Sequence, residues 1–215
     1  MFAAKLLGWV LLGLVRLLTG AQARWWGCPP KAEQRIYFAN HQSHLDLVMI
    51  WAALPEELRS ITRPIAARDY WANTPMKRWI TTEVFNAIYV ERGGTPAPAE
   101  AGAPPPDPMA PLQPLVEALE SGDSIIIFPE GTRGHTGEPQ KFKSGLFTLA
   151  QMFPDVVLVP AWIDNVQRVM PKGEIVPVPI LCSVTFGAPI TLAPGEERRA
   201  FLDRAREAVI ALRHV

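Results

Sequence analysis

Acidic side chains are missing from the start of this sequence, where no Asp or Glu precedes Glu33. Residues 1–27 carry Lys5, Arg16 and Arg24, although the 21 Lys and Arg residues of the whole chain balance its 21 Asp and Glu residues. A chain without net charge lacks the basic excess that is typical of proteins that bind nucleic acid. We therefore expect no nucleic-acid partner, and a basic character confined to the N-terminal segment.

Cysteine is also scarce. Cys28 and Cys182 are the only two, without the close spacing of metal ligands and too few for a disulfide framework, so we interpret them as free thiols. The sequence contains no Gly-x-Ser-x-Gly motif, the strand-to-helix turn that exposes a nucleophilic serine. Neither cysteine has surroundings that suggest a nucleophile. Covalent catalysis by serine or cysteine is therefore not predicted.

A long apolar run is absent as well. Residues 6–15 are almost entirely Leu, Val, Trp and Gly, but Arg16 interrupts them before the roughly 20 residues that a transmembrane helix needs. A basic segment rich in Leu and Trp is typical of a helix that lies in the membrane interface. We predict that residues 1–27 form such a membrane-anchoring helix. A true span, a signal peptide cleaved after residues 21–23, and an ordinary core helix are the alternatives.

The rest of the chain, residues 28–215, is long enough for one domain with a sizeable core. Its hydrophobic patterns predict strands at residues 35–39, 61–66, 87–90, 124–128, 156–159 and 182–186. Helices are predicted between them, at residues 47–53, 76–85, 112–119, 144–152 and 195–213. This alternation indicates an α/β fold with a mostly parallel central sheet flanked by helices, preceded by the N-terminal membrane-associating helix. Residues 93–111 contain seven prolines and are predicted to be a flexible loop.

A histidine and an aspartate follow the first predicted strand of this domain. His41 lies in the turn and Asp46 in the first turn of the next helix, for which Ser43 is the predicted N-cap. A carboxylate placed there is able to orient an imidazole that removes a proton from a hydroxyl group. A capping interaction between Ser43 and Asp46 is the alternative without catalysis. A metal site that uses His41, His44 and Asp46 is weaker, because the spacing does not match a dense metal-binding motif.

The second notable segment, Phe128-Pro129-Glu130-Gly131-Thr132-Arg133, closes a very apolar strand. Pro129 ends the strand pairing, Gly131 permits an unusual backbone angle, and Arg133 is suited to hold an anion through two hydrogen bonds. In parallel α/β sheets, ligands bind where loops leave the carboxyl ends of the strands. Further cations near predicted strand ends indicate a phosphate pocket; these are Arg68, Lys77, Arg78, Arg92, Lys141 and Lys143. For Lys77, Arg78 and Lys141 individually, a solvated surface position or contact with lipid headgroups is the favoured alternative.

Four segments in order resemble the signatures of the glycerolipid acyltransferases. Residues 40–46 are similar to the first signature, residues 86–92 to the second, residues 128–133 to the third and residues 159–163 to the fourth. The set covers about residues 35–190 and looks most like the lysophosphatidic acid acyltransferase branch. Three departures stand out: Asn86 replaces the usual Gly, Tyr89 replaces the usual Phe, and the proline-rich segment is longer than is typical.

The resemblance implies a role for each matching residue. His41 would be the general base and Asp46 its orienting partner. The acceptor's glycerol phosphate would be bound by Arg92, Glu130, Gly131, Thr132 and Arg133. Three further cations are possible substrate-binding residues, namely Arg68, Lys141 and Lys143.

The resemblance further implies a reaction. A fatty acyl group would move from acyl-CoA or acyl carrier protein to the free hydroxyl of a lysophospholipid, most simply 1-acylglycerol-3-phosphate, which gives phosphatidic acid. No metal or other cofactor is expected. The protein would associate with membrane lipids at the cytoplasmic face of the inner membrane. Transfer to another lysolipid, hydrolysis of the thioester and silent lipid binding are the alternatives.

Overall fold

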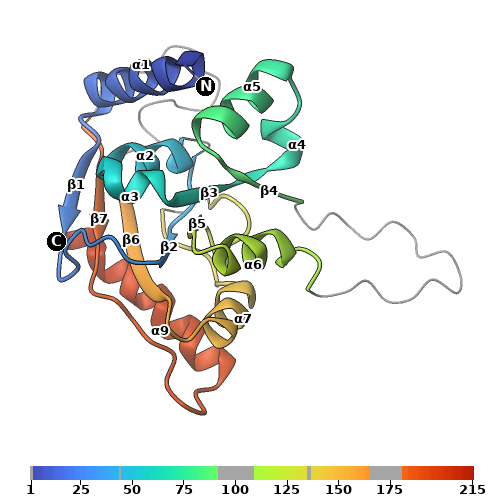
Figure 1. Cartoon of the computed structure of the whole chain (residues 1–215). Helices are drawn as coiled ribbons and strands as arrows, with labels where there is room; N and C mark the ends of the chain where they lie inside the picture. The colour runs from blue at the N-terminus through green and yellow to red at the C-terminus, as the bar shows by residue number, and fades with distance from the viewer. Residues whose placement is uncertain (1, 44, 92–108, 135–136, 165–180) are drawn as a thin grey trace, which may run out of the picture.

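A computed structural model describes residues 2–43, 45–91, 109–134, 137–164 and 181–215, without the side chains of residues 2–5. Seven strands form one sheet in the order β1-β7-β6-β2-β5-β3-β4 (Figure 1). Every neighbouring pair is parallel except β6 and β7, which confirms the predicted mostly parallel sheet. The strands are β1 Gln22–Trp25, β2 Arg35–Ala39, β3 Thr62–Ala67, β4 Ile88–Val90, β5 Ser124–Ile127, β6 Val157–Asp164 and β7 Ser183–Phe186.

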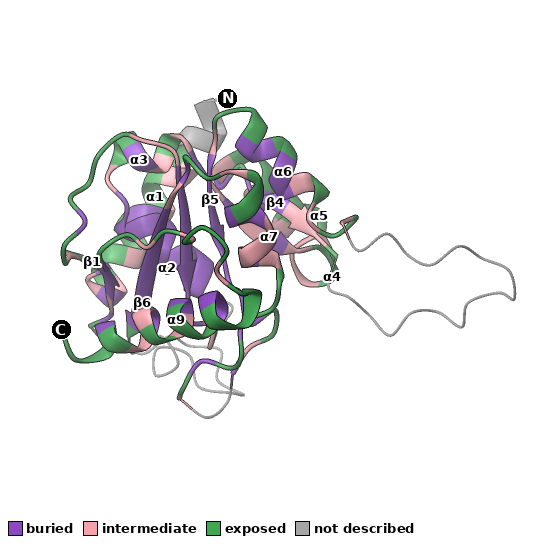
Figure 2. Cartoon of the chain, turned by 90° about the horizontal axis from the view of Figure 1, so that it is seen from below, coloured by how far each residue is buried: buried purple, intermediate pink, exposed green. Residues whose placement is uncertain are grey.

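Helices cover both faces of the sheet, as predicted. They are α1 Phe2–Thr19, α2 Asp46–Ala53, α3 Glu56–Ser60, α4 Arg68–Trp71, α5 Pro75–Trp79, α6 Gln113–Glu120, α7 Gly145–Met152 and α9 Arg198–Ala211. A π-helical turn, η1 Ile80–Val84, continues α5, and a 3₁₀ turn, η2 Leu212–His214, continues α9. Figure 2 shows the central strands buried between helices whose outer surfaces are exposed.

Alternate side chains of the central strands form two separate cores. Tyr37 of β2 packs with α1, α2 and η1 on one face, whereas Ile36 and Phe38 pack with α6, α7 and α9 on the other. All five residues of β2 are buried. Burial on both faces explains why the central strands read as continuous apolar runs instead of an alternating pattern.

The N-terminal segment differs from the prediction of one helix over residues 1–27. Helix α1 ends at Thr19, Gly20 follows with a φ of 71°, and residues 22–25 then form β1, which pairs in parallel with β7. The strand was not recognised because it has four residues and exposes every second one. The segment is therefore part helix and part edge strand of the domain.

Helix α1 has one face against the domain and one face exposed. Leu12 is buried, and Gly8 lies close to η1, where an added Cβ would be 3.5 Å from Cγ1 of Val84. Among the described residues, no helix has both the length and the apolar character that crossing a bilayer requires. Of the predicted proline-rich loop, residues 93–108 lie outside the described residues.

Candidate active site

The loop that follows β2 is anchored across the sheet by Asn40. Its side-chain amide donates to the carbonyl oxygen of Ile163 (3.0 Å), and its Oδ1 accepts from the Ile163 backbone N–H (2.8 Å). Asn40 is only 1% exposed, so both bonds are shielded from water. This pair connects the ends of β2 and β6, and it explains why the first and fourth signatures belong to one site.

His41 and Asp46 meet as predicted, although the helix begins differently. Nδ1 of His41 lies 2.9 Å from Oδ2 of Asp46, which is 1% exposed. Helix α2 starts at Asp46 itself with Leu45 in the N-cap position, so the prediction that Ser43 caps the helix is wrong. The Asp46 carboxylate instead holds the loop, because Oδ2 also accepts from the backbone N–H groups of Gln42 (2.6 Å) and Ser43 (2.8 Å).

These contacts determine which ring nitrogen is available. Because Oδ2 of Asp46 also accepts from two backbone N–H groups, we assign the hydrogen of the 2.9 Å contact to Nδ1 of His41. Nε2 then keeps its lone pair. The His41 side chain is 18% exposed and lines a cavity, so this lone pair is accessible to a bound hydroxyl group. This geometry suits an imidazole that removes a proton from a hydroxyl group while a carboxylate orients it.

Glu130 supports the same loop from the other side. Its Oε1 accepts from the His41 backbone N–H (2.7 Å) and its Oε2 from the Gln140 backbone N–H (2.8 Å). The side chain is 2% exposed, and burial raises the pKa of its carboxyl group, while the two backbone hydrogen bonds oppose that rise. Glu130 was predicted to contact the substrate; in this structure its carboxylate faces the main chain and positions His41.

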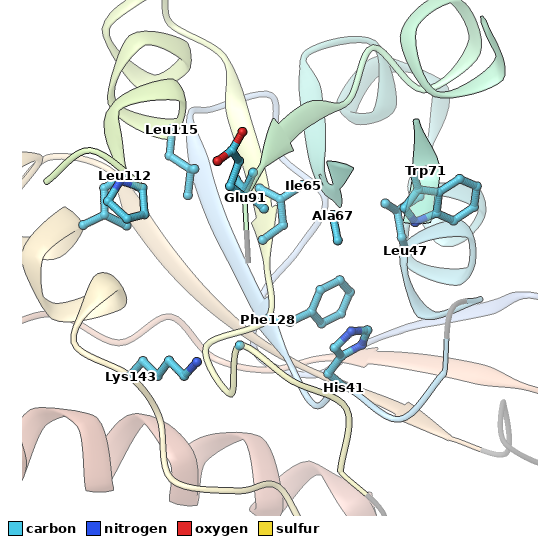
Figure 3. Close-up of a pocket in the computed structure, with 13 residues that line it drawn as sticks. His41, Leu47, Ile65, Ala67, Trp71, Glu91, Leu112, Leu115, Phe128 and Lys143 are labelled. Atoms are coloured by element: carbon cyan, nitrogen blue, oxygen red, sulfur yellow. The ribbon is translucent and has the colours of Figure 1, made fainter. Parts of the chain in front are cut away.

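A mostly apolar cavity of about 240 Å³ opens beside His41 (Figure 3). The imidazole stacks on Phe128 with ring centroids 4.4 Å apart and planes inclined by 19°. The cavity lies where β2, β3, β4 and β5 end, which is the edge at which ligands bind in parallel sheets. It is lined by His41, Leu47, Ile65, Ala67, Trp71, Val90, Glu91, Pro111, Leu112, Leu115, Phe128, Gly131 and Lys143.

Gly131 and Lys143 form the cationic wall of this cavity. Gly131 has a φ of 69°, and a Cβ built on it would lie 2.6 Å from Nζ of Lys143. Only glycine therefore lets the lysine side chain lie across the turn. The Lys143 backbone N–H donates to the carbonyl oxygen of Pro129 (2.8 Å), which fixes the lysine beside the third signature.

The other predicted substrate-binding residues fall into three groups. Arg92 lies outside the described residues, as does His44, the weaker metal candidate. Thr132 is exposed and Arg133 is half-buried; both belong to the turn after β5 but not to the cavity wall. Arg68 and Lys141 lie elsewhere: the Arg68 guanidinium stacks on Tyr89, 5.6 Å from the ring centroid, and Lys141 lines a separate groove with residues of α9.

The backbone conformation at residue 86 explains why asparagine is able to replace the usual glycine of the second signature. This residue has a φ of 48°, in the left-handed region that glycine adopts most readily and asparagine tolerates better than other residues. Its side chain is exposed, and its carbonyl oxygen accepts from Nε of Arg63 (3.0 Å). Asparagine in place of glycine therefore preserves the backbone turn that leads into β4.

The apolar walls of the cavity were not identified from the sequence. Trp71 and Leu47 come from α4 and α2, and Leu112 and Leu115 come from α6 and the turn before it. These residues have no chemical signature that separates them from ordinary core residues. Within the described residues, no three His, Cys, Asp or Glu side chains gather as a metal site would require.

Comparison with known proteins agrees with this geometry. The model of the family described as Acyltransferase matches residues 29–164, so the chain belongs to the Acyltransferase family. It is 28% identical to the 1-acyl-sn-glycerol-3-phosphate acyltransferase alpha of Homo sapiens over 189 residues, which is 85% of this chain and 60% of that protein. The mouse protein of the same name is 29% identical over 148 residues, 67% of this chain and 45% of its own length.

A solved structure supports the fold. The crystal structure of the 1-acyl-sn-glycerophosphate (LPA) acyltransferase PlsC from Thermotoga maritima superimposes with a TM-score of 0.66 at 20% identity, over 99% of this chain and 80% of that one. At this identity the likeness establishes the α/β fold alone. The chain also spans only 45% to 60% of the length of the mammalian relatives it matches.

Proposed function

We propose that this protein transfers a fatty acyl group from a thioester donor to the free hydroxyl of 1-acylglycerol-3-phosphate. The observation that carries the proposal is the His41–Asp46 pair at the mouth of an apolar cavity, with Nδ1 of His41 committed to Asp46 at 2.9 Å and Nε2 free to act. Membership of the Acyltransferase family and the names of the mammalian relatives support the same reaction.

His41 takes one proton and returns it in this mechanism. Nε2 removes the hydroxyl proton as the acceptor oxygen attacks the thioester carbonyl carbon. The new C–O bond forms, the C–S bond breaks, and the imidazolium gives its proton to the departing thiolate. Asp46 stabilises the imidazolium between these steps, since its buried carboxylate is 2.9 Å from Nδ1. The products are an ester and a thiol, without a covalent intermediate on the protein.

The acceptor's phosphate would lie against the turn after β5. Lys143 supplies a cation at the cavity wall, and Gly131 gives it the space to lie there. We propose Arg133, Thr132 and Arg92 as further phosphate ligands, because guanidinium and hydroxyl groups suit a phosphate. Glu130 contributes by holding the His41 backbone. The apolar walls suit the hydrocarbon part of the lipid.

The location of the protein follows from the substrate. Both acceptor and product are membrane lipids, so we propose that the exposed face of α1 rests on the bilayer, at the cytoplasmic face of the inner membrane. Leu17 and Trp9 on that face are 82% and 66% exposed. Acyl-CoA or acyl carrier protein would then supply the donor from the aqueous side.

One assay separates this reaction from thioester hydrolysis. The full chain is incubated with labelled acyl-CoA or acyl carrier protein, with and without 1-acylglycerol-3-phosphate, alongside the His41→Ala variant. We expect thioester consumption only when the lysolipid is present, with phosphatidic acid as the product. Free fatty acid formed without an acceptor would identify a hydrolase, and equal transfer by His41→Ala would refute the mechanism. Lysophosphatidylglycerol, an ornithine lysolipid and glycerol phosphate, tested in parallel, determine the preferred acceptor.

A further inference from the structure

Exposed apolar side chains are concentrated on two helices. Seven of the eleven large hydrophobic residues that are exposed among the described residues belong to α1 or α5, namely Leu6, Trp9, Val10, Leu14, Leu17, Met76 and Trp79. Single exposed apolar residues are ordinary on a protein surface, but a contiguous group indicates an interaction site. Met76 is 70% exposed and Trp79 is 40% exposed on a helix of only five residues.

The two helices lie on the same side of the molecule. α1 and η1, the direct continuation of α5, both pack in the core that covers one face of the sheet. Trp9 of α1 and Val84 of η1 line the same surface hollow. Figure 1 shows α1 and α5 together along the top of the molecule, with α7 and α9 at the opposite side. Helices α1 and α5, which carry these exposed apolar residues, therefore lie on one side of the molecule.

The charges on α5 itself are positive, whereas Glu56 and Glu83 line the hollow beside it. Lys77 and Arg78 lie between Met76 and Trp79, and residues 74–82 contain no acidic side chain. The Lys77 ammonium lies 4.0 Å from the centroid of the Tyr70 ring, and Arg78 is exposed. Aromatic and apolar side chains flanked by Lys and Arg are suited to a membrane interface with anionic headgroups.

We propose that α5 is a second bilayer contact beside α1, in which Met76 and Trp79 enter the interface while Lys77 and Arg78 meet anionic headgroups. Trp71, which lines the cavity, precedes Pro75, the first residue of α5, by four residues. A bilayer against α5 therefore brings lipid to the Trp71 wall of the cavity. This inference rests on the proposed function only in taking the acceptor to be a lipid.

Site-specific labelling tests the contact directly. Cys28 and Cys182 are 2% and 1% exposed, so a cysteine introduced by Met76→Cys is labelled selectively with an environment-sensitive fluorophore. Leu17→Cys on α1 is the positive control. Met152→Cys on α7 is the matched negative control, since Met152 is 45% exposed and its helix packs on the opposite face of the sheet.

Vesicles of phosphatidylcholine and phosphatidylglycerol are then added to each labelled full-length protein. We expect a blue shift, and quenching by a lipid-borne quencher, at positions 17 and 76 but not at 152. A response at 17 alone would overturn the proposal and leave α1 as the single contact. If none of the three labels responds and sedimentation shows a dimer, the surface is an interface between copies and the proposal is wrong.

A sedimentation assay measures how much α5 contributes to vesicle binding. The double variant Met76→Ser and Trp79→Ser should bind these vesicles about tenfold more weakly than the wild type in a sedimentation assay, because two apolar side chains lose their burial in lipid. Met152→Ser should bind like the wild type. Transfer to a lysolipid supplied as dispersed monomers should be unchanged in the double variant, so a failed contact is distinguished from a failed reaction. Equal vesicle binding by wild type and double variant would refute the role of α5.

Discussion

On one side of the cavity, two buried carboxylates hold the loop that carries His41, whereas on the other side the Lys143 cation lies beside Gly131. Asp46 accepts three hydrogen bonds through one oxygen, and Glu130 accepts one through each of its two. Lys143 has no hydrogen bond or ion pair to another described side chain and rests against Gly131. A base must have fixed geometry before its substrate arrives, whereas a flexible ammonium group is able to adapt to a phosphate.

The largest effect is expected on the His41 side of the cavity. His41→Ala should lower kcat for acyl transfer by about 10²–10⁴-fold, the usual contribution of a general base. Asp46→Asn should also lower kcat strongly, because it removes the charge that stabilises imidazolium. The double variant should be no slower than His41→Ala, since the two residues act as one unit. Steady-state rates of the three variants test this, and additive losses would show that Asp46 acts apart from His41.

Glu130→Gln should mainly reduce stability. An amide accepts through one oxygen only, so either the His41 or the Gln140 backbone N–H loses its buried partner. Such a loss costs about 1–3 kcal/mol of unfolding free energy. Urea denaturation measures it, and transfer rates should fall as His41 loses its support. A variant as stable as the wild type would show that Glu130 does not hold the loop.

The same variant has a defined pH dependence. Burial raises the pKa of the Glu130 carboxyl group, so the folded protein holds this proton more tightly than the unfolded chain does. Its contribution to stability is therefore fully present below the ordinary carboxyl pKa and is lost as pH rises through the raised value. The stability advantage of the wild type over Glu130→Gln should shrink across that window. An advantage that grows there would contradict the assignment.

A smaller effect is expected on the cationic side. Lys143→Ala should raise KM for the lysolipid acceptor by roughly tenfold, on the scale of one lost charged hydrogen bond, with little change in KM for the thioester. Lys141→Ala is the matched control, because Lys141 lies two residues away and lines a different groove. Acceptor titrations of the two variants compare them. An equal increase in the acceptor KM of both variants would indicate an effect of general surface charge instead of a phosphate site.

The smallest effect is expected from Asn86→Gly, at the turn before β4. Because its φ of 48° suits glycine as well as asparagine, Asn86→Gly should change stability by only a few tenths of a kcal/mol. Asn86→Val should cost about 1–3 kcal/mol, since a β-branched residue is strained there. Thermal unfolding of both variants provides the test. A glycine variant with altered acceptor preference would show that the Asn86 side chain itself contacts substrate.

Much of the fold was predictable because its central strands are apolar runs separated by amphipathic helices. β2 was predicted to the residue, and the approach of Asp46 to His41 was predicted from their places in the turn and the next helix, while their roles as a pair came from the family resemblance. β1 was not predicted, because it has only four residues and none of them is buried. The sequence also did not distinguish Lys143 from Lys141, since the direction of a side chain in a loop depends on packing. The direction of the Glu130 side chain was likewise not predictable, because its carboxylate binds backbone N–H groups ten and 89 residues away.

The clamp between Asn40 and Ile163 also has a consequence for how the protein is made. The two residues are separated by 123 positions, and β2 pairs with β5 and β6, which are both distant in the chain. Contacts of such separation form slowly and late, because a long loop must be closed first. During synthesis, the loop that carries His41 therefore lacks the Asn40–Ile163 hydrogen bonds until residue 163 has been added to the chain. Under the proposed function, we therefore expect acyl transfer only from a chain that extends past residue 163.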